Sequence, residues 1–191
     1  MRKSIMSKKT NTPEKAKPIE GEKRWEALLR GQIINATTLK FSRGIQLADQ
    51  KAQALIFLNS ILIPLALNWI DKPQFHTSAL ICIIAASCSI LAAIICIYPK
   101  RKAGRTDKGT LNYLHFNDIG HMKREDYLDE FLPIFNDPQR LGEAAVKDLH
   151  DTAQNSMLPK FFWLKIAYAI FFFGNLIAII SVIAQFKTLV I

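Results

Sequence analysis

Charged residues are missing from three long stretches of the sequence, residues 52–70, 73–99 and 166–186. A helix of 19 residues is about 28 Å long, close to the roughly 30 Å thickness of the hydrocarbon core of a bilayer. Core helices of soluble proteins seldom continue past about 14 residues without a charge. The absence therefore favours three membrane-spanning helices over the alternative, three buried helices of a soluble α domain.

Other features are also absent, and each absence excludes a class of protein. The first fifty residues contain no long apolar run, so we expect neither a signal peptide nor a cleaved leader. The sequence has no glycine-rich phosphate loop and no Ser-His-Asp or Cys-His set with a nucleophile elbow. We therefore predict no catalytic residues and expect the protein not to be an enzyme.

Cysteine is scarce, and the three cysteines all lie in the second apolar stretch, as Cys82, Cys88 and Cys96. Packing explains them better than a disulfide or a metal site. One other set resembles a metal or acid–base cluster: His115, Asp118, His121, Asp148, His150 and Asp151. The stretch HFNDIGH lacks the spacing of a known zinc motif. We interpret these residues as exposed loop and helix-surface residues, and no metal is expected.

The patterning predicts an all-α integral membrane protein. It has three transmembrane helices, a long N-terminal helix and a helical cytoplasmic insertion between spans two and three. The expected segments are a disordered basic tail (1–20), a cytoplasmic helix leading into the membrane (21–51), a transmembrane hairpin (52–99), a cytoplasmic helical module (100–160) and a third transmembrane helix (161–187).

Helical periodicity and proline positions define these segments. In the first helix, Trp25, Leu28, Leu29, Ile33 and Ala36 recur at three- and four-residue intervals, as expected for one helical face. No proline interrupts this helix before residue 64, so it should run directly into the first span. Later, Asp137 followed by proline predicts a capped helix start. Pro159 predicts a kink or a restart before the third span.

The distribution of basic residues predicts the orientation in the membrane. Residues 1–51 contain 12 Lys and Arg against 5 Asp and Glu, and five bases follow the second span within KRKAGRTDK. The positive-inside rule then places the N-terminus and residues 100–160 in the cytoplasm. The net charge of +9 is explained by this topology and by attraction to anionic lipid. A nucleic-acid-binding tail is a weaker alternative, and no nucleic-acid partner is expected.

Several polar residues lie inside or at the edge of the apolar stretches. Asn59 and Asn68 in the first span and Asn175 in the third are explained either as hydrogen-bonding contacts between helices or as the lining of a water or ion path. Lys51 marks the cytoplasmic edge of the first span. Asp49 gains nothing from anionic lipid there, so we expect a basic partner: Arg43, Lys51 or a base between residues 100 and 108.

Two motifs resemble a known family. LADQKAQALIFLNS resembles the motif that opens the first membrane helix of Pycsar transmembrane effector proteins, and LNYLHFNDIGHMKREDYLDEF resembles the connector and following helix of that family. The order of the spans also fits, and the resemblance covers roughly residues 25–186. Pro159 departs from the unbroken helix expected at the start of the last span.

The resemblance implies a bacterial antiphage effector of the inner membrane. In that family a partner cyclase makes cyclic CMP (cCMP) or cyclic UMP (cUMP) on infection, and the effector senses the nucleotide and damages the membrane. This outcome is abortive infection. A homo-oligomer is expected, because three spans hardly enclose a pore. No other cofactor is expected.

A cyclic mononucleotide brings one negative charge and one base, so its site needs Arg or Lys for the phosphate and aromatic or amide groups for the base. Lipid anchoring and packing are the alternative roles for such residues. The candidate ligand residues are Arg101, Arg105, Arg124, Arg140, Tyr113, His115 and Asn117. Two rival functions stay open: a non-enzymatic membrane scaffold or regulatory subunit that recruits a cytosolic partner, and a membrane enzyme, for which no catalytic set is found.

Overall fold

A computed structural model describes residues 20–98 and 111–190 of the chain. Every regular element within these two ranges is a helix. Three helical segments are long and apolar enough to cross a membrane: Trp25–Leu67, His76–Ile97 and Pro138–Gln185. The predicted fold class, an all-α membrane protein with three spans and a long N-terminal helix, is confirmed.

The first element, α1 (Glu20–Leu67), is one uninterrupted helix of 48 residues. At about 1.5 Å per residue it is about 72 Å long, more than twice the roughly 30 Å core of a bilayer. Pro64 lies in its last turn, so the one backbone hydrogen bond that its missing N–H removes lies at the end of the helix and does not interrupt it. The helix that precedes the first apolar stretch therefore continues into it, as the sequence predicts.

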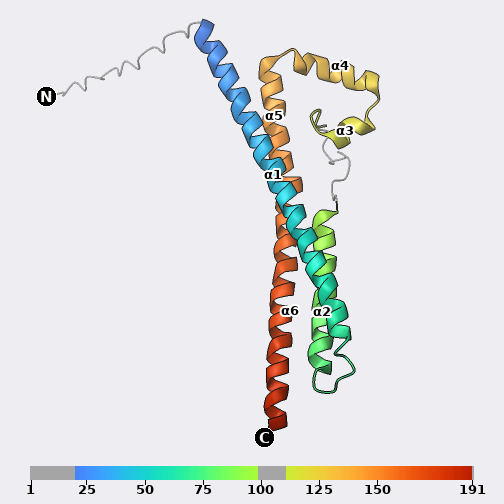
Figure 1. The fold of residues 1–191 in the computed structure, drawn as a ribbon. Helices are drawn as coiled ribbons and strands as arrows, with labels where there is room; N and C mark the ends of the chain where they lie inside the picture. The colour runs from blue at the N-terminus through green and yellow to red at the C-terminus, as the bar shows by residue number, and fades with distance from the viewer. Residues whose placement is uncertain (1–19, 99–110, 191) are drawn as a thin grey trace, which may run out of the picture.

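A turn over residues 68–75 leads to α2 (His76–Ile97), which returns beside α1 (Figure 1). The buried residues of α2 are all small: Ser78, Ala79, Ala85, Ala86, Ser89, Ala92, Ala93 and Cys96. Small residues let helix backbones approach closely inside a membrane. The third membrane helix comes close to α2 at Gly174, where an added Cβ would lie 2.2 Å from the Cβ of Ala85.

The first, second and last helices of the chain pack together as a three-helix bundle. Three shorter helices lie outside it and are called the outer helices: α3 (Phe116–His121), α4 (Arg124–Phe135) and α5 (Pro138–Thr152). Figure 1 shows α5 beside the first half of α1, with α3 and α4 on the far side of α5 from α1. The Asp137 side chain caps α5 by accepting hydrogen bonds from the backbone N–H of Gln139 and Arg140, at 2.9 and 3.3 Å. The capped start predicted at this position is confirmed.

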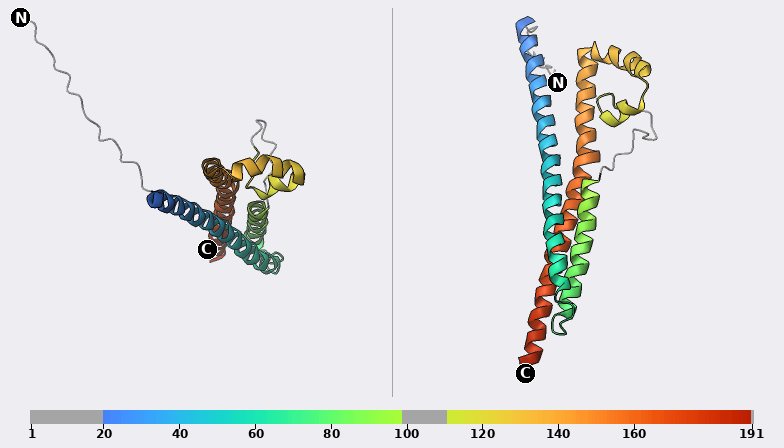
Figure 2. Two further views of the ribbon diagram at one scale, coloured as in Figure 1. Left: turned by 90° about the horizontal axis from the view of Figure 1, so that it is seen from above. Right: turned by 45° about the vertical axis from the view of Figure 1, so that its right-hand side comes forward.

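The chain then passes through a π-helical segment, η1 (Ala153–Met157), into α6 (Leu158–Val190). Pro159 is the second residue of α6, and its missing N–H removes one backbone hydrogen bond to the preceding turn. The helix type changes directly before this proline, while α5, η1 and α6 continue as one rod (Figure 2). The predicted kink or restart is therefore limited to this change of helix type, and the rod continues from α5 into the packed end of α6.

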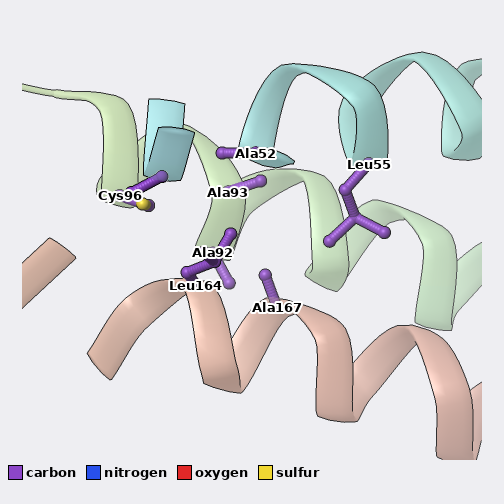
Figure 3. Packing of buried hydrophobic residues seen from close by; sticks show 8 residues of the cluster. Ala52, Leu55, Ala92, Ala93, Cys96, Leu164 and Ala167 are labelled. Carbon is purple, nitrogen blue, oxygen red and sulfur yellow. The ribbon is translucent and has the colours of Figure 1, made fainter. Parts of the chain in front are cut away.

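The core lies where α1, α2 and α6 meet. Its buried members are Ala48, Ala52, Leu55, Ala92, Ala93, Cys96, Leu164 and Ala167 (Figure 3). Outside this core, most large side chains of the three apolar helices are exposed. Such an outward-facing apolar surface is expected where the surrounding medium is lipid.

Candidate functional site

Asn112 is the centre of a polar network between helix α5 and the connector, the described residues 111–115 that precede α3. Its buried side chain donates hydrogen bonds to Asp148 Oδ1 at 3.0 Å and to Asp151 Oδ2 at 3.1 Å. Its backbone N–H donates to Asp118 Oδ2 at 3.1 Å, and its Oδ1 accepts from the backbone N–H of Leu114 at 3.1 Å. One amide thus joins the connector, α3 and α5.

Tyr113 joins the same connector to α4. Its hydroxyl donates to Glu130 Oε2 at 2.6 Å, and its carbonyl accepts from the Tyr127 hydroxyl at 3.3 Å. The Tyr127 ring stacks on Phe131, with centroids 5.2 Å apart. The hydrogen bond to Glu130, then partial burial and the nearby negative charge, raise the pKa of Tyr113 above its usual value of 10.0. The phenol is therefore held in its neutral, donating form.

This network corrects the interpretation of the histidine and aspartate cluster as exposed. Asp118, Asp148 and Asp151 are half-buried and hydrogen-bonded to Asn112, and His115 is buried. Only His121 and His150 are exposed as expected. Within residues 20–98 and 111–190, no group of three or more His, Cys, Asp or Glu is placed to hold a metal ion.

The predicted ligand residues that the structure describes lie in the connector and in three different helices, α3, α4 and α5. Arg124 is exposed at the start of α4, and Arg140 is exposed in α5, with its Nε 3.4 Å from Asp137 of its own cap. Tyr113 and His115 belong to the connector, and Asn117 lies in α3. Arg101 and Arg105 lie outside the described residues.

A small pocket of about 190 Å³ lies between α1 and α5. It is lined by Thr38, Phe41, Ser42, Ile45, Gln46, Asp148, Leu149 and Thr152. Asp148 belongs both to this pocket and to the Asn112 network, so it joins the two. Sequence reasoning missed this pocket because its two walls are about one hundred residues apart along the chain.

Asp49 has a different partner from those predicted. Its carboxylate forms an ion pair with Lys160 on α6, rather than with Arg43, Lys51 or a base between residues 100 and 108. The Asp49 and Lys160 side chains are 29% and 16% exposed. Lys51 is exposed, and its carbonyl accepts from the Tyr168 hydroxyl at 3.5 Å. The ion pair thus joins α1 to the beginning of α6.

Helix α2 also contacts Lys160, the residue that pairs with Asp49. The Cys96 thiol donates to the Lys160 carbonyl at 3.2 Å. The side chain of Lys160 therefore contacts α1 while its backbone contacts α2. All three helices are linked at the end of the bundle that is nearest to the outer helices.

A second polar contact joins the three helices deeper in the bundle. Asn59 is fully buried, and its Nδ2 donates to Leu55 O at 2.9 Å and to Ser89 Oγ at 3.1 Å. The Ser89 hydroxyl in turn donates to the Ala167 carbonyl at 3.0 Å. The buried Oδ1 of Asn59 has no hydrogen-bond partner among the described residues, which costs free energy in a dry interior.

The other two intramembrane asparagines differ from Asn59. Asn175 is half-buried and donates to Phe171 O, one turn back in α6, at 2.7 Å, and its Oδ1 lies 3.9 Å from the Cys82 sulfur. Asn68 follows the last residue of α1 and is exposed. Of the three, Asn59 makes the short side-chain contact between helices.

Comparison with known proteins gives one family match. A model of the Pycsar effector protein domain matches residues 35–186, which includes the Asn112 network, the Asp49–Lys160 pair and the Asn59 contact. No curated protein and no solved structure matches the chain.

Proposed function

The chain belongs to the Pycsar effector family, and we propose that it impairs the inner membrane when it binds a cyclic pyrimidine mononucleotide, cCMP or cUMP. Membership makes it an effector of a Pycsar-type antiphage system, which includes a partner cyclase. In the proposal, the cyclase makes the nucleotide on infection and the effector, without enzymatic activity, stops the phage by stopping the host. The N-terminus and residues 100–160 then lie in the cytoplasm.

The observation that carries the proposal is the continuity of two rods. Helix α1 extends without a break from the outer part of the molecule into the bundle, and α5 continues through η1 into α6. The small pocket lies between these two rods. A ligand that changes the separation of α1 and α5 outside the membrane must therefore act on the first and third spans.

The Asp49–Lys160 pair and the Asn59–Ser89 contact would hold the resting arrangement. They link the same two rods and α2 at two depths. A ligand moves such an equilibrium only by binding the active arrangement more tightly than the resting one. A shift from 1:99 to 99:1 needs a preference of about 10⁴-fold, or about 5.5 kcal/mol.

The nucleotide contacts are proposed to come from two sources. The arginines Arg101, Arg105, Arg124 and Arg140 offer charge for the phosphate, and Tyr113, His115 and Asn117 offer groups for the base. The polar residues of the pocket supply further donors and acceptors, and Phe41 supplies an aromatic surface. Asp148 connects the two sets, because it lines the pocket and accepts from Asn112 beside Tyr113.

The test supplies cCMP or cUMP to bacteria that express the protein and measures dye uptake and membrane depolarisation. The proposal expects both within minutes of exposure to the cognate nucleotide, and neither with the purine counterparts. The Asp148→Asn variant, which keeps an acceptor oxygen for Asn112 but loses the negative charge, should need more nucleotide. Membranes that stay tight, together with co-purification of a cytosolic partner, would instead identify a scaffold.

A further inference from the structure

The first half of α1 has an apolar ridge on the side away from α5. Trp25, Leu28, Leu29 and Leu39 are 69%, 52%, 54% and 51% exposed, and Ala36 between them is also exposed. At about 100° per residue these five positions share one face of the helix. Figure 1 shows α5 on the other side of this part of α1 and no further described helix over the ridge.

A large groove opens on the opposite side of the same stretch of helix. Its volume is about 1410 Å³, and its walls come from residues 27–34 of α1 and 138–150 of α5. Ile33 and Val146, 65% and 59% exposed, lie along it. Gly31 and Gly142 also line it, and nothing lies within 4 Å of a Cβ added at either position. The groove is thus open, largely apolar and wide enough for side chains from another helix.

We propose that the ridge of one copy packs into the groove of the next copy, so that the chain assembles head to tail in the membrane. An interface whose two halves lie on different faces of a subunit is heterologous, and it closes into a ring when the rotation between copies permits. This assignment goes beyond the proposed function, which does not say how copies of the chain meet. The sequence predicts a homo-oligomer but not its surfaces.

The membrane makes the two halves meet at the same height. Because α1 continues unbroken into the first span, its residues 25–39 lie at the same distance from the bilayer in copies that share one conformation. The groove is lined by residues 27–34 of the same helix, so it lies at that distance too. All copies also share one orientation, so a neighbour presents its ridge parallel to the groove without any further adjustment.

The rest of the chain offers little to cover the ridge. Residues 1–19 and 99–110 are rich in Lys, Arg, Ser, Thr and Pro and contain few large apolar residues. Trp25, Leu28, Leu29 and Leu39 are each more than half exposed, so the ridge offers apolar surface toward the about 800 Å² that each partner contributes to a standard interface. Confinement to one membrane raises the effective concentration of the copies. A second copy is therefore the occupant that fits best.

Disulfide cross-linking in liposomes tests this assignment. In a background with the three native cysteines replaced by alanine, Ala36→Cys and Val146→Cys place one thiol on the ridge and one in the groove. With both changes in each chain, mild oxidation should give a ladder of dimers, trimers and larger species. Each change alone should give monomers. A strong dimer from Ala36→Cys alone would mean that two ridges pack symmetrically and would overturn the assignment, as would monomers throughout.

Filling the groove provides a second test. Gly142→Leu should fit the folded monomer and reduce the ladder at least fivefold, while Gly120→Leu in α3, which also has open space, should leave it unchanged. If residues 1–19 of the same chain occupied the groove, Val146→Cys would resist maleimide even at high dilution in lipid, and the assignment would fall. Cross-linking needs no nucleotide, so nucleotide-dependent dye uptake without a ladder would reject the interface alone.

Discussion

Gly174→Ala is expected to push α2 and α6 apart in the middle of the bundle. The new Cβ would lie 2.2 Å from the Cβ of Ala85, whereas carbon atoms in contact are normally about 3.5–4.0 Å apart. The helices must therefore separate by more than about 1 Å at this point or move along each other. Overpacking of this kind costs about 1–3 kcal/mol.

A gain in helix propensity opposes this loss, because alanine is favoured over glycine inside a helix by about 1 kcal/mol. In micelles dilute enough to separate the copies, Gly31→Ala gives the propensity term alone, since no atom of the chain lies within 4 Å of the added Cβ there. The difference in free energy of unfolding between the two variants should therefore be about 1–3 kcal/mol. Unfolding in mixed micelles at increasing SDS, followed by circular dichroism, measures this difference.

A compensating change makes the test specific for the contact. Ala85→Gly removes the methyl group that the new Cβ would strike, so combining it with Gly174→Ala should recover most of the lost stability. If Gly174→Ala unfolds at the same SDS fraction as Gly31→Ala, and Ala85→Gly adds nothing, then α2 and α6 do not pack as closely as described.

Three further predictions concern the polar contacts. Asp49→Lys should lower the free energy of unfolding by about 1–3 kcal/mol by opposing Lys160, and adding Lys160→Asp should recover at least half of it in the same SDS assay. Asn112→Ala leaves carboxylates of α5 without their donor, and faster proteolysis of the connector should show its release. The raised pKa of Tyr113 predicts that stability from its bond to Glu130 is still present as pH approaches 10 and is lost as pH rises through the higher, folded-state value. Absorbance at 295 nm should show a late-titrating component that Tyr113→Phe removes.

The fold was predictable because the sequence signals that determine its helices are local. Uncharged runs of membrane length identify the spans, the lack of proline before Pro64 makes α1 continuous, and Asp137 with the following proline begins α5. Each of these signals acts within one or two turns of helix. The same reasoning anticipated a change at Pro159 but not a π-helical segment, because hydrogen-bond register depends on how the rod packs against α1.

The polar contacts were harder to predict because they depend on distant partners. The position of Asp49 at the predicted membrane edge indicates that it needs a basic partner. Its partner, Lys160, is 111 residues away along the chain, and the sequence favours bases that are nearer. Asn112 carries one local signal, since asparagine in a connector often bonds the backbone two residues on. Its bonds to Asp148 and Asp151 arise only when α5 is placed beside the connector.

The length of α1 makes it a mechanical lever. If the membrane edge lies at Lys51, as the sequence predicts, the helix extends about 46 Å beyond it to its start at Glu20. A tilt of about 10° then carries its free end through about 8 Å, more than one 5.4 Å pitch. A tilt of α1 that hardly moves its packed alanines in the bundle therefore displaces Trp25 by a much larger distance. Conversely, a modest force applied near that tip acts on the bilayer with considerable mechanical advantage.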